Sequence, residues 1–313
     1  MARRGNPVHG WVVLDKAADI TSTEAVARVR RVYEAKKAGH AGTLDPLATG
    51  VLPIALGEAT KTVARLMEAR KHYRFTVRWG AETSTDDLEG DVVAESPVRP
   101  APGEVAAALT RFVGEIEQVP PSFSAIKIGG ERSYDRARRG EKVTLAPRPV
   151  TVYAADLVEM PDLDHAIIDV VCGKGAYVRA LARDLARALG TVGHASALRR
   201  TRVGPFGEAG AISLDKLEEL GHSGAAFEHL NPVETALDDI PALAVAGREA
   251  RRLRCGQSIT LTRGQLEQVC DDSTVYASFG NRAVALGEVR GGQFHPTRVF
   301  NLPIKGKIDV DFD

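Results

Sequence analysis

The sequence is poor in the residues that build metal sites and disulfide frameworks. Its three cysteines, Cys172, Cys255 and Cys270, lie far apart and form no Cys-x-x-Cys pair, which argues against both a disulfide network and a zinc site. The eight histidines include no His-Glu-x-x-His pattern, and no run of carboxylates has calcium-loop spacing. No metal is therefore predicted.

Long apolar runs are also missing. No stretch approaches the roughly 18 apolar residues that cross a bilayer, and no apolar run of signal-peptide length follows the first residues. The 313 residues are 44% hydrophobic and 26% charged, a composition typical of soluble globular proteins, and their number suggests about two domains. We expect a cytoplasmic protein.

The chain has no net charge, with 41 basic and 41 acidic residues, which at first argues against a nucleic-acid partner. The charge is unevenly distributed, however. Residues 1–80 carry +7 and residues 171–204 carry +6, whereas 81–120 and 205–247 each carry −7. The basic segments could form one face around a cleft, although ordinary solvated surfaces are often patchy in the same way.

A phosphate-binding loop is suggested and then excluded. A predicted strand over 166–172 ends at Gly173-Lys174-Gly175 and leads into a predicted helix over 176–190. The Walker pattern would require glycine in place of Ile168 and a hydroxyl residue in place of Gly175. The nucleotide-loop interpretation therefore fails.

Hydrophobic spacing predicts an α+β chain in two domains. The basic, irregular segment 121–150 suits a flap over a polyanion, and the acidic run 86–91 is interpreted as a solvated hairpin. From residue 243 the texture changes to short strands of a small β-barrel-like module, so we place the domains at 1–242 and 243–313. Other strands are predicted at 9–16, 73–80 and 197–204, and helices at 25–33 and 104–112.

The segment 39–61 is punctuated by glycine and proline and contains one carboxylate, Asp45. Such punctuation predicts a shaped loop, and loops on a rigid scaffold often carry chemistry. Asp before Pro46 is equally a good helix cap, since the carboxylate accepts from free backbone N–H groups. Composition and spacing alone favour the cap.

The segment 39–61 resembles the catalytic motif of the TruB family of tRNA pseudouridine synthases. Further motifs follow in family order: Lys71-His72-Tyr73-Arg74, the Val119 to Lys127 run, Gly173 to Arg179, and Leu198-Arg199-Arg200. The resemblance covers roughly residues 9 to 205. The last 70 or so residues resemble, less specifically, the RNA-binding PUA-type domain of that family.

The resemblance implies the pseudouridine synthase fold, a mixed and mainly antiparallel sheet flanked by helices and loops, followed by a PUA-like domain. It implies isomerisation of uridine 55 in the T loop of tRNA, with the base flipped out of its stack. The partner is the T-arm stem-loop. No cofactor, protein partner or membrane is required, and the protein is expected to act as a monomer.

The same resemblance implies the site. Asp45 acts at the glycosidic bond, Arg179 is its cationic partner, and Tyr73 stacks on the flipped uracil. The substrate-binding residues are predicted to be His40, Tyr177, Leu198 and Lys16. The basic stretch 28–37, the flap, and Arg199, Arg200 and Arg202 are expected to meet phosphates.

One departure from the family pattern lies beside Lys16. Ala17 and Asp19 stand where the family usually has Pro and Gly, and Asp accepts positive φ less readily than Gly. Two other functions stay open at this point. They are a non-enzymatic RNA-binding or RNA-folding module, and a pseudouridine synthase that depends on a guide RNA.

Overall fold

The computed structural model describes residues 5–124, 126–141 and 143–303. Parts of three sequence predictions fall outside these residues. Residues 1–4 belong to the predicted first domain, Ala125 and Lys142 to the flap, and 304–313 to the predicted second domain.

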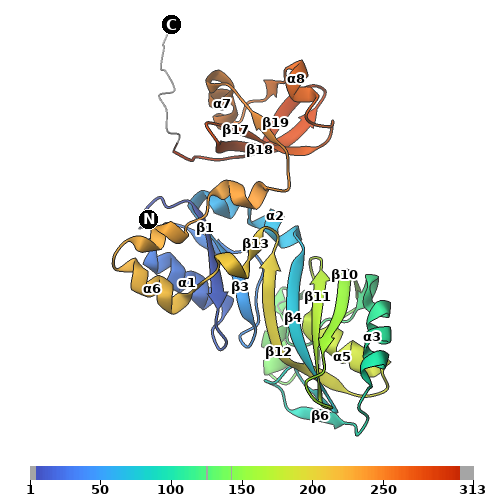
Figure 1. The fold of residues 1–313 in the computed structure, drawn as a ribbon. Helices are drawn as coiled ribbons and strands as arrows, with labels where there is room; N and C mark the ends of the chain where they lie inside the picture. Colours follow the sequence, from blue (N-terminus) through green and yellow to red (C-terminus); the bar gives the residue numbers. More distant parts are fainter. Residues whose placement is uncertain (1–4, 125, 142, 304–313) are drawn as a thin grey trace.

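A ten-stranded sheet forms the larger, N-terminal unit (Figure 1). Its strands run in the order β14-β1-β3-β12-β4-β11-β10-β7, with β2 and β13 attached to β3 and β12. Only the β1–β14 and β3–β12 pairs among them are parallel, so the predicted mixed, mainly antiparallel sheet is confirmed. The strands are β1 (Gly10–Lys16), β2 (Ala38–His40), β3 (Thr49–Leu56), β4 (Lys71–Trp79), β7 (Gly114–Gln118), β10 (Arg148–Glu159), β11 (His165–Cys172), β12 (Gly193–Val203), β13 (Phe206–Gly207) and β14 (Ile212–Ser213).

Helices and short turns of helix pack on this sheet. Thr21 caps the first helix, because its side chain accepts a hydrogen bond from the backbone N–H of Glu24. The helices of this unit are α1 (Ser22–Val32), α2 (Val63–Glu68), α3 (Pro102–Leu109), α4 (Ser133–Arg138), α5 (Val178–Ala188) and α6 (Leu214–Gly221). The 3₁₀ turns are η1 (Gly57–Lys61), η2 (Thr110–Phe112), η3 (Glu208–Gly210), η4 (Ala225–His229) and η5 (Val233–Leu237).

Two hairpins lie outside the large sheet. One pairs β5 (Ala81–Thr83) with β6 (Val92–Glu95) and carries the acidic turn between its strands. The other pairs β8 (Lys127–Ile128) with β9 (Glu131–Arg132) inside the predicted flap. The flap leaves the sheet after β7 and returns at β10, so it is a long excursion between two strands that pair with each other.

A curled sheet of five strands forms the C-terminal unit, in the order β15-β17-β18-β19-β16. Figure 1 shows this unit in orange and red, beyond one end of the large sheet. Its core includes Leu253, Val284 and Phe294. The elements are β15 (Ala242–Ala244), α7 (Gly247–Arg254), β16 (Ile259–Thr260), α8 (Arg263–Leu266), β17 (Thr274–Phe279), β18 (Arg282–Arg290) and β19 (Gln293–Val299).

The two units share one apolar cluster. Phe300 and Leu302, which follow β19, are buried in the cluster that contains Trp11 and Phe206 of the large unit. Polar contacts flank it. The ammonium of Lys61 donates to the carbonyl of Val299 at 2.7 Å, and the carboxylate of Glu58 accepts from the backbone N–H of Asn301, also at 2.7 Å.

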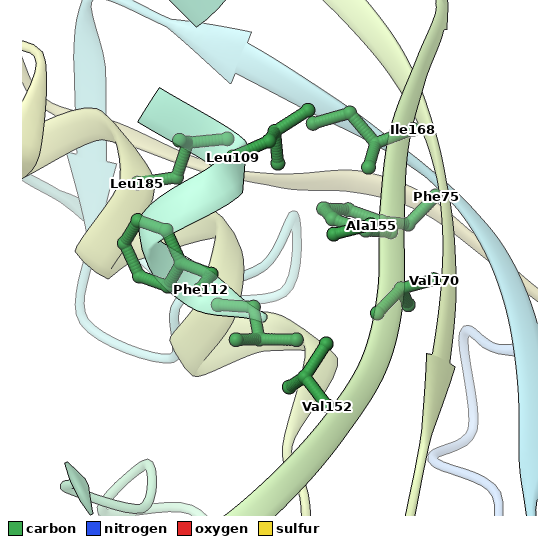
Figure 2. Close-up of a pocket in the computed structure, with 9 residues that line it drawn as sticks. Phe75, Leu109, Phe112, Val152, Ala155, Ile168, Val170 and Leu185 are labelled. Atoms are coloured by element: carbon green, nitrogen blue, oxygen red, sulfur yellow. The ribbon is translucent and has the colours of Figure 1, made fainter. Parts of the chain in front are cut away.

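Figure 2 shows a cavity in the core rather than a ligand site. It has a volume of about 10 Å³ and lies where η2 and α5 meet the sheet. A water molecule needs at least that much space and polar partners, and every lining side chain is apolar. The lining residues are Phe75, Leu109, Phe112, Val152, Ala155, Ile168, Val170, Leu181 and Leu185. Among the described residues, no helix is long and apolar enough to span a membrane.

Candidate active site

The loop that carries Asp45 connects β2 to β3 beside the middle of the sheet. Glycine is required at its second end, because Gly50 has φ of 99° and a Cβ there would lie 2.2 Å from the carbonyl oxygen of Arg200. Gly42 also has positive φ, at 94°. The glycine punctuation that predicted a shaped loop thus reflects left-handed backbone and the close approach of β12.

Four hydrogen bonds hold the backbone on either side of Asp45. The hydroxyl of Ser22 donates to the carbonyl of Leu44 at 3.0 Å and accepts from its N–H at 2.9 Å. The ammonium of Lys16 donates to the carbonyl of Pro46 at 2.9 Å, and the N–H of Asp19 donates to the same carbonyl at 3.0 Å. The peptide groups next to Asp45 are therefore fixed before any substrate binds.

Lys16 has a different role from the predicted substrate contact. Its side chain is fully buried, and besides Pro46 it donates to the carbonyls of Ala17 and Ile20. An ammonium has three donors, so none remains for a substrate. Burial lowers the Lys16 pKa to about 8, against the opposing charges of Asp45 and Asp19.

Asp19 occupies the position where a glycine is usual. Its φ is 65°, so it adopts the left-handed conformation that Asp tolerates better than most residues. Asp19 therefore forms the same kind of left-handed turn that a glycine would form at this position. The N–H of Asp19 still reaches the carbonyl of Pro46.

Arg200 supports the same loop from β12. Its guanidinium donates to the carbonyl of Val51 at 2.8 Å and to that of Gly42 at 3.1 Å, and only 1% of the residue is exposed. Arg200 is therefore not one of the phosphate contacts that the sequence predicted, because a buried guanidinium cannot reach RNA. Its neighbour Arg199 is partly exposed and ion-paired to Asp15 and Glu208, while Arg202 is exposed.

Arg179 joins the Asp45 loop to the rest of the site. Its Nε lies 2.8 Å from Oδ2 of Asp45 and its Nη1 3.0 Å from Oδ2 of Asp87. The Arg179 side chain is 4% exposed and the Asp87 side chain 2%, whereas Asp45 keeps 34%. The Nε–H makes no well-directed hydrogen bond, so its contact with Asp45 is an ion pair that leaves the carboxylate partly open. The arginine thus faces one buried carboxylate and one accessible carboxylate.

The acidic turn after β5 lies in a hairpin, as predicted, but only its second half, with Glu89 and Asp91, is solvated. Asp86 and Asp87 are 6% and 1% exposed, because each pairs with an arginine of α5. The Asp87 carboxylate also accepts from the hydroxyl of Thr85 and from the N–H of Glu89. A run of carboxylates looks solvated in sequence because its cationic partners lie about 95 residues away.

Tyr73 lies on the same strand face as Phe75 and pairs in register with Arg200 of β12. Burial raises the pKa of its phenol, so the hydroxyl stays protonated over the physiological range. The charge of Arg200 acts in the opposite direction. Leu198, two residues before Arg200, is buried in the core cluster that Tyr73 contacts.

Tyr177 and His40 complete the predicted set. The backbone N–H of Tyr177 donates to the side-chain oxygen of Gln118 at 2.8 Å, and its carbonyl accepts from the amide nitrogen at 3.1 Å. Burial raises the Tyr177 pKa. Burial, helped by the charge of Arg200, lowers the pKa of His40, which favours a neutral imidazole.

Sequence reasoning missed Ser22, Thr85, Asp87 and Gln118, which all support the site from elsewhere in the chain. Ser22 resembled an ordinary residue beside a helix cap, and Gln118 the end of a strand. One signal in the sequence could have identified Asp87. Asp86 and Asp87 are adjacent acids, and Arg179 and Arg183 are spaced one helical turn apart, so the two acids can each pair with one arginine. Among the described residues, no group of three or more His, Cys, Asp or Glu side chains is arranged to hold a metal ion.

Comparison with known proteins places this arrangement among related sequences. Residues 30–178 match the family described as TruB family pseudouridylate synthase (N terminal domain), and residues 179–238 match the tRNA pseudouridylate synthase B C-terminal domain. The chain is 56% identical over 309 residues to a protein named tRNA pseudouridine synthase B from Caulobacter vibrioides, with 96% of this chain and 100% of the relative covered. It is 58% identical over 300 residues to a protein of the same name from Bradyrhizobium diazoefficiens, covering 94% and 86% of the two chains.

The fold also matches a solved structure. A chain in the structure of an H/ACA RNP bound to a substrate RNA containing 2'-deoxyuridine superimposes with a TM-score of 0.73. The match covers 97% of this chain and 91% of that chain at 23% sequence identity, a level that shows the fold alone. The predicted fold class is thereby confirmed, and the curled C-terminal sheet is consistent with the predicted PUA-like domain.

Proposed function

The chain belongs to the TruB family of pseudouridine synthases, and we propose that it isomerises uridine 55 in the T loop of tRNA to pseudouridine. As a pseudouridine synthase it is an isomerase. The observation that carries the proposal is Asp45, a half-open carboxylate on a loop whose flanking peptides are all fixed, paired with a buried arginine. We further propose that it acts in the cytoplasm as a monomer.

The reaction breaks one bond and forms another on the same sugar carbon. The C1′–N1 bond of uridine is cleaved, the uracil rotates, and a C1′–C5 bond replaces it. The hydrogen on C5 leaves as a proton, and N1 gains one. Atoms and electrons balance without an oxidant, reductant or energy source.

Asp45 supplies the group that acts at the ribose, as nucleophile or as base. Fixing its peptide neighbours removes motions that would otherwise have to be frozen at the transition state. Arg179 orients the carboxylate through its Nε contact, and Asp87 holds the arginine from the buried side. The neutral phenol of Tyr73 is a stacking surface for the extruded uracil and a candidate for proton transfer at C5.

A uridine in the T loop is stacked and must be flipped out, at a cost of about a few kcal/mol. We assign that work to contacts with the RNA backbone. Four exposed cations follow one another at the end of α1 and the approach to β2: Arg30, Arg31, Lys36 and Lys37. They border one groove and lead along the chain to His40 and the Asp45 loop. Such cations position RNA through its phosphates without reading its sequence.

Tritium release tests the proposed function. A T-arm stem-loop labelled with tritium at C5 of uridine should lose tritium to water when it is mixed with the purified chain alone. Asp45→Asn should bind the same RNA and release none. Full release by that variant contradicts the proposal.

The same assay separates the two other functions. Binding of tRNA with no tritium release by the unsubstituted chain favours an RNA-binding or RNA-folding module. Release that appears only after another RNA is added favours a guide-dependent enzyme. The paired Asp45, Arg179 and Tyr73 favour turnover on the bare stem-loop.

A further inference from the structure

A second arginine of α5 is buried one helical turn after Arg179. Arg183 is 7% exposed, and its guanidinium makes three contacts at 2.8 Å each. Nη1 donates to the carboxylate of Asp86, Nε to that of Asp184, and Nη2 to the carbonyl of Val119. Burying a guanidinium and two carboxylates carries a desolvation cost, and such groups can be retained because they fix the conformation of the chain around them.

The third contact identifies what is fixed. Val119 is the first residue after β7 and lies two residues before the flap. The chain leaves β7, forms the flap and returns at β10, and residues 118–123, the outgoing end of the flap, have three attachments to α5 and to Tyr177 just before it. Gln118 bonds the backbone of Tyr177 in both directions, Val119 accepts from Arg183, and Phe123 accepts from Nη2 of Arg179 at 2.9 Å.

The attachment at Phe123 reaches the catalytic pair directly. The guanidinium that receives Asp45 is the one that donates to the Phe123 carbonyl. The Phe123 contact does not involve Arg183 or Asp86, so it can keep Arg179 in place when the Val119 contact is lost. The Val119 contact, four residues earlier, holds the part of the outgoing end that lies further from Asp45.

Asp86 takes an unusual backbone conformation to meet Arg183. Its φ is 61°, a left-handed conformation that is strained for a residue with a Cβ and persists when surrounding contacts impose it. The turn is held by β12, since the carbonyl of Asp86 accepts from the N–H of Ala195 at 3.0 Å. Asp86 and Arg183 also line a groove with Pro120 and Val143, beneath the two ends of the flap.

We propose that Arg183 and Asp86 are a positioning pair for the flap, which hold its outgoing end in the orientation that clamps RNA over Asp45. The pair touches neither Asp45 nor any group assigned to the reacting uridine. It rests on the proposed function for its substrate, the T arm of tRNA. Its effect is on capture of RNA, whereas Asp45 and Arg179 determine the chemical step.

The test compares Arg183→Gln and Asp86→Asn with Arg187→Gln as the matched control. Arg187 lies one turn further along α5 and is ion-paired to Glu82 at 2.7 Å. It lines the same groove but makes no hydrogen bond or ion pair to the flap among the described residues, so it controls for loss of a nearby charge. Trypsin cleavage within the flap at 136–139 is measured on the full chain without RNA. Tritium release gives KM and kcat separately, and a melting curve shows that each variant is folded.

We expect flap cleavage to rise about tenfold in both variants, because cleavage follows the population of the open form. KM for the stem-loop should rise about tenfold while kcat at saturating RNA stays within about twofold, which marks a loss of binding rather than of chemistry. Arg187→Gln should match the unsubstituted chain in all three. Arg183→Lys, which keeps the charge but has fewer fixed donors, should fall between.

Unchanged cleavage and KM in folded Arg183→Gln and Asp86→Asn overturn the proposal. A tenfold loss of kcat with an unchanged KM overturns it as well. If Arg183→Gln does not fold, the near-isosteric Asp86→Asn decides by the same criteria. If the unsubstituted chain releases no tritium, the proposed function fails. The cleavage comparison still decides whether the pair anchors the flap.

Discussion

The hydroxyl of Ser22 hydrogen-bonds both backbone groups of Leu44, the residue immediately before Asp45. Ser22 begins α1 and is buried, so the first helix determines the position of the Asp45 loop. A single side chain thus replaces the partner that a neighbouring strand would provide. The position of the Asp45 carboxylate depends on a contact between segments 22 residues apart.

Ser22→Ala should lower both stability and activity. It leaves the buried N–H and carbonyl of Leu44 without their partner, which costs about 1 to 3 kcal/mol of unfolding free energy. Urea unfolding measures that cost, and tritium release measures kcat. Ser22→Thr, which keeps the hydroxyl, is the control. An alanine variant with unchanged kcat would show that the loop is held adequately by its other contacts.

Arg179→Gln should be strongly destabilised as well as inactive. It leaves the Asp87 carboxylate buried without a cation, and breaking a buried pair in this way costs about 3 to 5 kcal/mol. Adding Asp87→Asn should recover much of the stability but none of the activity, because Asp45 still lacks its partner. Melting curves and tritium release on the two single variants and the double variant complete the cycle. Recovery of activity in the double variant would show that Arg179 acts only through Asp87.

Lys16 should make stability depend on alkaline pH. Its pKa is about 8 in the fold and 10.5 in the unfolded chain, so between these values the unfolded chain binds a proton that the folded chain does not. The contribution of Lys16 to the unfolding free energy therefore rises as pH increases from 8 to 10.5, by at most about 3 kcal/mol. Unfolding curves of the unsubstituted chain and of Lys16→Met across this range measure the difference. A parallel pH dependence of the two proteins would contradict the assignment.

Deprotonation of Lys16 should lower activity over the same pH range in which it raises the unfolding free energy. Deprotonation removes one of the three donors that Lys16 gives to Ala17, Ile20 and Pro46, so the Asp45 loop is held less firmly. We expect kcat for tritium release to decline above about pH 8. Lys71, whose pKa burial also lowers to about 8, is the necessary comparison. The decline should persist in Lys71→Met and disappear in Lys16→Met.

The four exposed cations at the end of α1 and on the approach to β2 should govern the salt dependence of RNA binding. Each phosphate contact removed by Arg30→Gln or Lys37→Gln should reduce the slope of log affinity against log salt by about 0.7 to 0.9. Lys216→Gln is a matched control, since Lys216 is exposed and ion-paired to Glu219 on α6. Titrations of the stem-loop at several salt concentrations give the slopes. Equal slopes for all variants would place the RNA on another face.

Periodicity and glycine spacing, which are local, were sufficient to predict individual strands and the Asp45 loop, whereas the mixed sheet was predicted from the resemblance to the TruB family. Sequence reasoning failed wherever a charge finds its partner far along the chain. Arg200 appeared to be a surface cation next to Arg199, yet it is buried against carbonyls of the loop 42–51. Asp86 and Asp87 appeared solvated, yet both face α5. Burial of a charge is decided by tertiary contacts, which local patterns do not encode.

The apolar cluster shared by Trp11, Phe206 and Phe300 makes the distance between the C-terminal sheet and Asp45 a fixed dimension of the molecule. Swinging one unit against the other would expose the side chains of that cluster to water, at about 25 cal/mol for every Å² uncovered. The two units are therefore held at one spacing, and any ligand that contacts both of them must match that spacing. A chain cut after residue 242 would lose Phe300 and Leu302 from that cluster, and the exposed patch would favour aggregation.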